Sequence, residues 1–582
     1  MRLDSILRRM LQTRLFLIAA LAAASSHPIE TWAADRLAEM QTQAIATANE
    51  KRARAYHFGS QGAGDVFTNH TSHTNRLVPV YAFGNKVDLG AVTRSNSVYR
   101  DEKRLRKLFG DRLPENTLNP TADYADQSDL HRVQKEAVAK GVKHLFIIWF
   151  DGMDWDTTRA AAIAKSGQMY RKGKGGGLGF LDYAQGNPQF ASVVTTPIFD
   201  KNTPDVDAQT VVIPPDSLLG GYDAEIAGPN PWTVGSLFPK APGYLKGQSA
   251  DASDKAGVAA AGRLLHSYTD SSSSAGEVAT GMKQYNNGVN VTPDGRFPQT
   301  IFQELQGQGW RVGTVTSVPF SHASPAAMYA HNVHRDDYQD LSRDLLGLRS
   351  IVQETGKVGA KPGLDVVIGT GFGKELDAGA LTKARGKTTA GKNVEAGNAF
   401  ITANDLRAID VRNGGKYVVV TTEIGKKGTT ELAAATKRAV EGGHRLFGFY
   451  GGEGVDHLPY RTADGDYRPT PGVRGGAEKY SKEFLESQPT LADVTTAALD
   501  VLAAGKKPFA LFVEAGDVDF ALHDNNLDNA IGALLSGDDA VKRVFEWVEK
   551  NSNWDDAAVI VTADHGHYLV IDDPNALIGT AK

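Results

Sequence analysis

Short, continuous runs of apolar residues recur along this chain, and the first clear one occupies residues 144–150. An uninterrupted run of this length is typical of a strand that is buried on both faces of a parallel sheet. We therefore predict a strand here and at each comparable run. These further runs lie at 312–316, 365–368, 417–421, 445–449, 509–513 and 558–562.

Segments in which apolar residues recur at helical spacing alternate with the predicted strands. They occupy residues 129–141, 298–309, 490–503 and 538–551, and a more polar helix is expected at 36–56. This alternation predicts an α/β fold with a doubly wound, mostly parallel central sheet and helices on both faces. In such a sheet, ligands bind beyond the carboxyl ends of the strands.

Residues 170–262 interrupt the alternation with many Gly, Pro, Asp and Ser residues. We interpret them as a long irregular insertion, packed over the edge of the sheet where an active site is expected. The glycine-rich stretch 172–177 does not fit a phosphate-binding loop, because no Gly-Lys-Ser or Gly-Lys-Thr sequence opens a helix there.

Composition narrows the possible functions. The chain has 582 residues, and its 63 basic and 68 acidic side chains give a formal net charge of −5. Nucleic-acid-binding domains are usually basic, so we predict none here. There is no cysteine, which excludes disulfides and thiolate metal sites. A zinc site would have to use His, Asp or Glu.

The N-terminal residues 1–33 resemble a signal peptide. Basic residues, including Arg8 and Arg9, precede an apolar stretch at 15–24 that is too short to cross a bilayer. Residues 31–33 offer a cleavage site, with Ala24 as a rival, and the arginine pair allows either Sec or twin-arginine export. The alternative is an uncleaved amphipathic N-terminus.

We expect residues 34–582 to form one exported catalytic domain, in the periplasm or outside the cell. No later apolar run is long enough for a membrane span.

Metal-compatible side chains follow several predicted strands. Asp151, Glu514 and the pair Asp564–His565 each come after an apolar run, and the serine-containing segment 317–324 follows another. Since the carboxyl ends of parallel strands meet at one edge, these groups are expected to converge there. A single acidic residue after a strand could belong to an ordinary polar loop. Metal-compatible residues after four strands at one edge are harder to explain in that way.

Two further groups of metal-compatible side chains are less specific. Asp519 and His523 are spaced i and i+4, so on a helix they share one face, as either zinc ligands or a salt-bridged surface pair. His57, His70 and His73 fit no standard metal-site spacing, which favours a loop of hydrogen-bonded histidines.

A run of serines at 271–274 follows Asp270 and precedes a possible helical turn at 277–281. A serine at a helix N-terminus has backbone N–H groups nearby, which favour a phosphate dianion. By itself, however, the run is more typical of a flexible linker than of a nucleophile segment.

Four segments, together with the Asp151 region, resemble the alkaline phosphatase family in sequence and in order. They are Thr269-Asp270-Ser271 through Thr280-Gly281, His322-Ala323-Ser324-Pro325-Ala326-Ala327 with His331 to Arg335, Val513-Glu514 through Asp519 and His523, and Thr562-Ala563-Asp564-His565-Gly566-His567. The resemblance extends over residues 144–567.

This resemblance implies hydrolysis of small or varied phosphate monoesters through a phosphoserine, with two Zn²⁺ ions and one Mg²⁺ ion. It also admits a homodimer. Each matched residue then has a family role: Ser271 as nucleophile; Arg335, steadied by Asp270, as phosphate ligand; Asp564, His565 and Asp151 at the first zinc; Asp151, Ser324 and Glu514 at magnesium; Asp519 and His523 at the second zinc; His322 and His567 as supporting residues.

The chain also departs from the family pattern. Phe520 follows Asp519 where some members carry a polar or charged residue, and Ser324 replaces the usual threonine. The family supplies a third histidine to the second zinc downstream of the last matched segment, but no histidine follows His567. We therefore expect either an incomplete chain or a second zinc site open on one side, with His567 and His457 as poor substitutes.

Two other functions remain in competition. A phosphodiesterase of the same superfamily would share the metal carboxylates, although Arg335 and the serine segment favour monoesters. A catalytically impaired phosphate- or metal-binding relative is supported only by the missing histidine.

Overall fold

The computed structural model describes residues 37, 57–58, 76–114, 116–232, 266–467, 480–524, 526–567, 569–571 and 574–578. The predicted signal peptide, His70, His73 and nearly all of the predicted helix 36–56 lie outside these residues. Among the described residues, every helix is too short or too polar to span a bilayer.

A ten-stranded sheet forms the centre of the molecule, with strand order β12-β13-β9-β8-β14-β4-β15-β2-β5-β3. The predicted strands correspond to β4 (His144–Phe150), β8 (Arg311–Pro319), β9 (Val366–Thr370), β12 (Tyr417–Thr421), β13 (Arg445–Phe449), β14 (Phe509–Ala515) and β15 (Ala557–Thr562). All seven run parallel to one another. The prediction of a mostly parallel sheet is confirmed.

The burial of these strands explains why they could be predicted from the sequence. Every residue of β14 and β15 is buried, as is every residue of β4 after His144. Strands covered on both faces need apolar residues at consecutive positions rather than at alternate ones. The three strands that carry the strongest apolar runs therefore lie side by side in the middle of the sheet.

Three strands at one side of the sheet were not predicted. They are β2 (Val78–Phe83), β3 (Ala125–Asp126) and β5 (Gln189–Val194). Strand β2 runs antiparallel to both of its neighbours, β15 and β5. The segment 170–262 is therefore not irregular throughout, because β5 is an integral strand of the central sheet.

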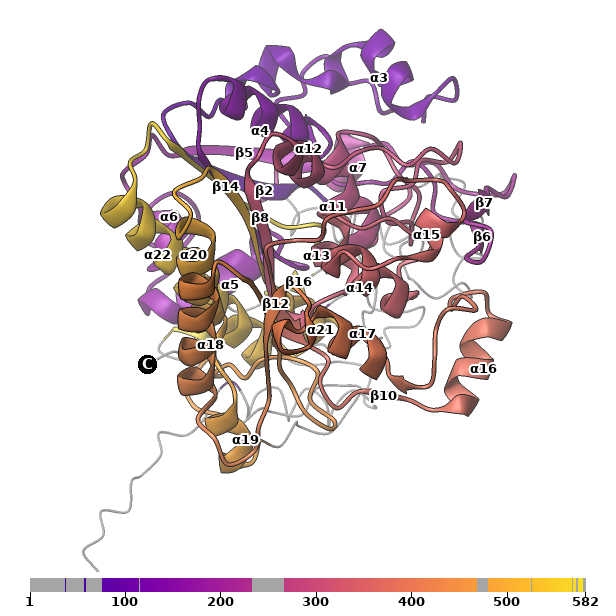
Figure 1. Cartoon of the computed structure of the whole chain (residues 1–582). Helices are drawn as coiled ribbons and strands as arrows, with labels where there is room; N and C mark the ends of the chain where they lie inside the picture. Colours follow the sequence, from indigo (N-terminus) through magenta and orange to yellow (C-terminus); the bar gives the residue numbers. More distant parts are fainter. Residues whose placement is uncertain are drawn as a thin grey trace, which may run out of the picture.

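Helices cover both faces of the sheet (Figure 1). One face packs against α18 (Gly428–Gly442), α20 (Leu491–Ala503) and α22 (Leu527–Asn551). The other carries α12 (Ile301–Gly307) and α13 (Ala323–Ala327), against which α11 (Ser271–Thr280) packs. Helix α4 (Asp129–Ala139) in turn contacts α11. The predicted helix 538–551 is only the second half of α22.

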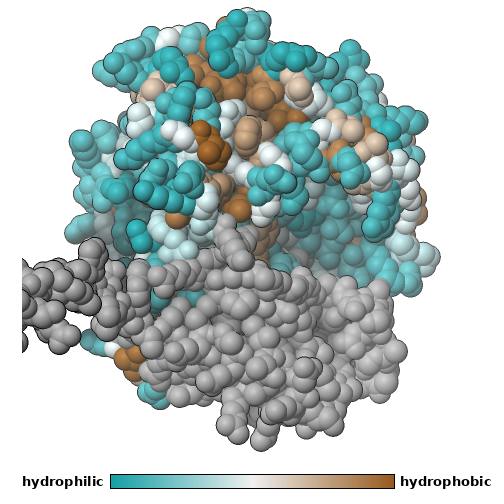
Figure 2. Space-filling model, turned by 90° about the horizontal axis from the view of Figure 1, so that it is seen from below, coloured by the Kyte–Doolittle hydropathy of each residue, from teal (hydrophilic) through white to brown (hydrophobic). Residues whose placement is uncertain are grey.

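In the coloured part of Figure 2 the surface is mainly polar, with apolar residues gathered near the middle of that part. The glycine-rich stretch 172–177 also lies outside the core. Its Gly175 and Gly177 amides donate to the Asp182 carboxylate at 2.6 and 2.8 Å. These N–H groups are occupied within the protein, in keeping with the exclusion of a phosphate-binding loop.

Candidate active site

The site residues converge at the carboxyl ends of β4, β8, β14 and β15. Asp151 follows β4 directly, and its N–H donates to Ala515 O of β14 at 3.3 Å. Asp564 and His565 follow β15. Two boundaries differ from the prediction, because Glu514 belongs to β14 itself and β8 continues past Ser317 to Pro319.

The first group of metal-compatible side chains consists of Asp151, Asp564 and His565, whose ligand atoms lie within 4.8 Å of one another. All three residues are buried. His565 Nε2 lies 3.1 Å from Asp564 Oδ2 and 3.6 Å from Asp151 Oδ1. The other oxygen of Asp564 accepts from the N–H groups of Gly152 and His565 at 2.8 and 2.9 Å. The backbone therefore fixes this carboxylate.

Electrostatics at this group favour a bound cation. Burial, together with the negative charges of Asp564 and Asp519, raises the pKa of Asp151 well above its ordinary value. Crowded, buried carboxylates repel one another, and a divalent cation among them offsets that repulsion. The donor set of two carboxylates and one imidazole is compatible with zinc.

A second group consists of Asp519, His523 and His567. Helix α21 (Asp517–His523) carries the first two on one face, as the i, i+4 spacing predicted. His523 Nε2 and His567 Nε2 lie 3.2 and 2.7 Å from Asp519 Oδ1. The two groups adjoin each other, because His565 Nε2 is 4.0 Å from the same oxygen.

His567 therefore lies much nearer to this second group than its sequence position suggested. The contact with Asp519 suits either a ligand or a side chain that orients the carboxylate. His457, the other candidate, faces Asp517 instead, with Nδ1 3.4 Å from Oδ1. Burial is the main cause that lowers the pKa of His567, to about 3, and the positive charge of a protonated His523 acts in the same direction.

A third group contains Glu514 and Ser324, the residues expected at magnesium. Ser324 Oγ and Glu514 Oε1 are buried, and neither has a hydrogen-bond partner within the described residues. The other oxygen of Glu514 accepts from Thr316, a neighbour on β8 that the sequence did not single out. Burial raises the pKa of Glu514 to about 8. Hard oxygen donors of this kind suit Mg²⁺.

The serine run forms the first turns of α11 rather than a linker. Asp270 caps this helix and accepts from the N–H groups of Ser272 and Ser273 at 3.3 and 3.1 Å. Their hydroxyls also donate to Asp270, at 2.6 and 2.7 Å. Ser274 Oγ donates to the Gln127 side chain. These three hydroxyls therefore face structural partners.

Ser271 differs from the other three serines. Its Oγ lies 3.4 Å from both Asp151 Oδ1 and His565 Nε2. It is thus the one hydroxyl of the run that contacts side-chain atoms of the first metal-compatible group. Ser271 is also the first residue of α11, at the positive end of the helix dipole, which favours an anion.

Arg335 lies beside this helix N-terminus. Its Nη1 donates to Asp270 Oδ2 at 2.9 Å, and its side chain is 14% exposed, so it remains accessible. Asn286 and Asn287, which were not predicted, hold Asp270 from the other side: Asp270 N–H donates to Asn286 Oδ1, and Asn287 N–H donates to Asp270 Oδ1, both at 3.0 Å. The sequence around these two asparagines has no apolar periodicity that could have identified them.

An aromatic group borders the site. The rings of His322 and Phe520 meet edge to face, with centroids 5.7 Å apart, and Tyr338 stacks on the opposite side of His322. Burial, assisted by the nearby Arg335 cation, lowers the pKa of His322 to about 4. His322 is consequently neutral near pH 7.

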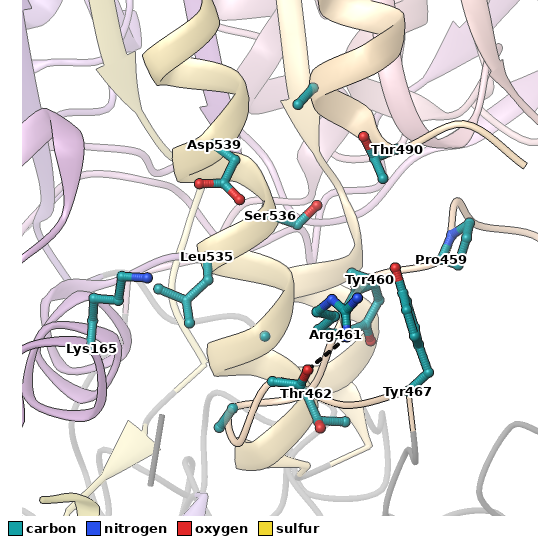
Figure 3. A pocket seen from close by; sticks show the side chains of 14 residues that line it. Lys165, Pro459, Tyr460, Arg461, Thr462, Tyr467, Thr490, Leu535, Ser536 and Asp539 are labelled. Carbon is teal, nitrogen blue, oxygen red and sulfur yellow. Dashed lines mark hydrogen bonds between the residues drawn. The ribbon is translucent and has the colours of Figure 1, made fainter. Parts of the chain in front are cut away.

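A pocket of about 210 Å³ lies between α22 and the segment 459–467 (Figure 3). The predicted site residues do not line it. Two basic side chains, Lys165 and Arg461, line it. Arg461 lies over the Tyr467 ring, 4.5 Å from the centroid, and donates to Gly465 O at 2.9 Å. The pocket is therefore not part of the candidate active site.

Comparisons with known proteins agree with the resemblance seen in the sequence. The alkaline phosphatase family model matches residues 255–576, more than half of the chain. Alkaline phosphatase 4 of Bacillus subtilis (strain 168) is 25% identical over 300 residues, covering 52% of this chain and 50% of that protein. Streptomycin-6-phosphate phosphatase of Streptomyces griseus is 29% identical over 375 residues, covering 60% and 72%.

Among solved structures, Thermus thermophilus alkaline phosphatase has a TM-score of 0.38 and 20% identity, covering 73% of this chain and 60% of that one. The chain spans about half the length of several of the curated relatives it matches.

Proposed function

Because the chain belongs to the alkaline phosphatase family, we propose that it hydrolyses phosphate monoesters with Ser271 as the nucleophile. The observation that carries this proposal is the position of Ser271 Oγ, 3.4 Å from both Asp151 Oδ1 and His565 Nε2. A hydroxyl at a helix N-terminus that also faces metal-compatible side chains is well placed to attack a phosphoryl group.

We propose that three divalent ions support this reaction. Asp151, Asp564 and His565 would hold one zinc, and Asp519 and His523 a second, with His567 orienting Asp519. Asp151, Ser324 and Glu514 would hold magnesium. The buried Ser324 Oγ and Glu514 Oε1, which have no hydrogen-bond partner in the described part of the chain, support that last assignment. When bound, such ions supply Lewis-acid stabilisation of the phosphoryl and seryl oxygens.

Arg335 and Asp270 would bind and orient the phosphate group. A guanidinium presents a planar fork of N–H donors that matches two phosphate oxygens. One of these donors is engaged by Asp270 at 2.9 Å, which holds the guanidinium beside Ser271. The positive end of the α11 dipole would assist by attracting the phosphate dianion.

The chemistry then requires two displacements. Ser271 Oγ releases its proton to solvent and forms a bond to phosphorus as the ester P–O bond breaks, and the alcohol leaves with a proton from solvent. Water next attacks phosphorus, the Oγ–P bond breaks, and inorganic phosphate and the free hydroxyl are regenerated. We further propose that the protein acts on phosphate monoesters of small molecules after export.

Metal removal tests this function. Strong chelation should abolish monoesterase activity, and zinc plus magnesium should restore it, because crowded carboxylates form much of the site. The same preparations should be assayed with a monoester and a diester. Full activity in a verified metal-free sample would contradict the metal assignment, and preferential turnover of the diester would favour the phosphodiesterase alternative.

A further inference from the structure

Gln127 connects two parts of the candidate active site. It follows β3 directly and is fully buried. Its Nε2 donates to Ala563 O at 3.0 Å, and its Oε1 accepts from Ser274 Oγ at 2.6 Å. A backbone carbonyl can only accept a hydrogen bond, so the side-chain amide must face Ala563 with its NH₂ group.

The two partners of Gln127 belong to α11, which carries Ser271, and to the segment after β15, which carries Asp564 and His565. Ser274 lies three residues after Ser271, about one turn further along α11. Ala563 immediately precedes Asp564 and His565. Ser274 Oγ is also 3.2 Å from Asp564 O, so helix and strand end meet at this point. Gln127 therefore spans the junction that sets the 3.4 Å separation of Ser271 Oγ and His565 Nε2.

We propose that Gln127 is a positioning residue that aligns the Ser271 nucleophile with the Asp564–His565 group. This inference rests on the proposed function. The planar amide holds a donor and an acceptor at a fixed separation, which a single apolar side chain cannot reproduce. Displacing a reacting group by about 1 Å can cost on the order of a hundredfold in rate. Loss of a residue that supports metal ligands typically costs about ten- to a hundredfold in metal affinity or activity.

Gln134 provides a matched control. It is also a fully buried glutamine, and its Nε2 donates to Val278 O of the same helix at 3.1 Å. Val278 lies further along α11, and the hydrogen bonds of the Gln134 amide go to Leu130 O and Val278 O rather than to residues 563–565. Gln134→Leu removes a buried hydrogen bond to α11 and leaves the contacts between α11 and residues 563–565 unchanged.

The experiment compares Gln127→Leu with Gln134→Leu in the full chain. For Gln127→Leu we expect kcat to fall about ten- to a hundredfold, with KM changed by less than about threefold, since the phosphate-binding Arg335 is untouched. The zinc dissociation constant, titrated with Zn²⁺ alone on the metal-free protein, should rise about tenfold or more. Gln134→Leu should lower the melting temperature while leaving kcat and zinc affinity near wild type.

Ser274→Ala keeps the test decisive if Gln127→Leu fails to fold. This variant should lower kcat in the same direction, because it removes the other half of the contact. If both single variants fold, the double variant should cost less than the sum of their effects, whereas Ser274→Ala with Gln134→Leu should be additive. Equal losses of kcat in Gln127→Leu and Gln134→Leu, or an unchanged kcat in Ser274→Ala, would overturn the positioning role alone. An inactive wild-type protein would overturn the proposed function and this role with it.

Discussion

The two groups of metal-compatible side chains differ in how the fold holds them. In the Asp151–Asp564–His565 group, each side chain follows a central strand, and two backbone N–H groups bind Asp564. The Asp519–His523–His567 group depends on the short helix α21, and the His523 side chain is 25% exposed, whereas that of His565 is fully buried.

This difference indicates a division of labour. The strand-end group contacts Ser271, the proposed nucleophile, and is buried, so its geometry is set by the core of the sheet. In the helix-borne group Asp519 and His567 are buried, and His523 is partly exposed. We therefore expect changes at the strand-end group to affect phosphoserine formation most strongly, and changes at the helix-borne group to affect metal retention and later steps.

The largest effect is expected for Ser271→Ala. Removing the attacking hydroxyl should abolish phosphoenzyme formation and reduce kcat on the order of a thousandfold or more. The measurement is steady-state turnover together with trapping and mapping of the phosphorylated residue. A trapped phosphate on Ser272 would show that the nucleophile is the next residue of α11.

The next effect separates the two groups directly. His565→Ala should remove phosphoenzyme formation, whereas His523→Ala should retain a detectable burst while steady turnover falls. We expect the two losses of phosphorylation rate to differ by about tenfold or more, because His565, unlike His523, contacts Ser271. Rapid-mixing kinetics on both variants, with zinc content measured in parallel, check this. Equal burst amplitudes would refute the division of labour.

A smaller effect is expected for Gly152→Ala, which affects both groups at once. Gly152 has φ +75, and an added Cβ would lie 2.8 Å from two ring atoms of His567. Forcing a side chain into this left-handed conformation costs about 1–3 kcal/mol. The variant should melt at a lower temperature and lose zinc more readily, as measured by thermal unfolding and metal analysis. Wild-type values for both would show that the loop adapts.

The smallest effect is expected for Ser272→Ala, the matched control for Ser271→Ala. Its hydroxyl binds Asp270 at 2.6 Å rather than the metal-compatible groups. Loss of one such hydrogen bond costs about 0.5–1.5 kcal/mol, so kcat should fall by less than about tenfold. Steady-state kinetics suffice, and a loss as large as that of Ser271→Ala would remove the distinction between the two serines.

Several features could be predicted from the sequence because they depend on local patterns. Strands β4, β12 and β13 have the predicted bounds, since buried parallel strands are continuous apolar runs. Asp151, Asp564 and His565 were found because polar residues directly after such runs must lie at one sheet edge. The spacing of Asp519 and His523 likewise placed them on one helical face.

Other features were decided only by the tertiary structure. Strand β5 lies in a segment without a clear apolar run, and its pairing with β2 depends on a partner more than a hundred residues away. The matched family segment already singled out Ser271 among the four serines, but only the structure shows which groups each of their hydroxyls contacts. Gln127 meets Ala563 across 436 positions. Side-chain contacts of this kind leave no periodic signal along the chain, because a single hydrogen bond constrains two distant residues and none between them.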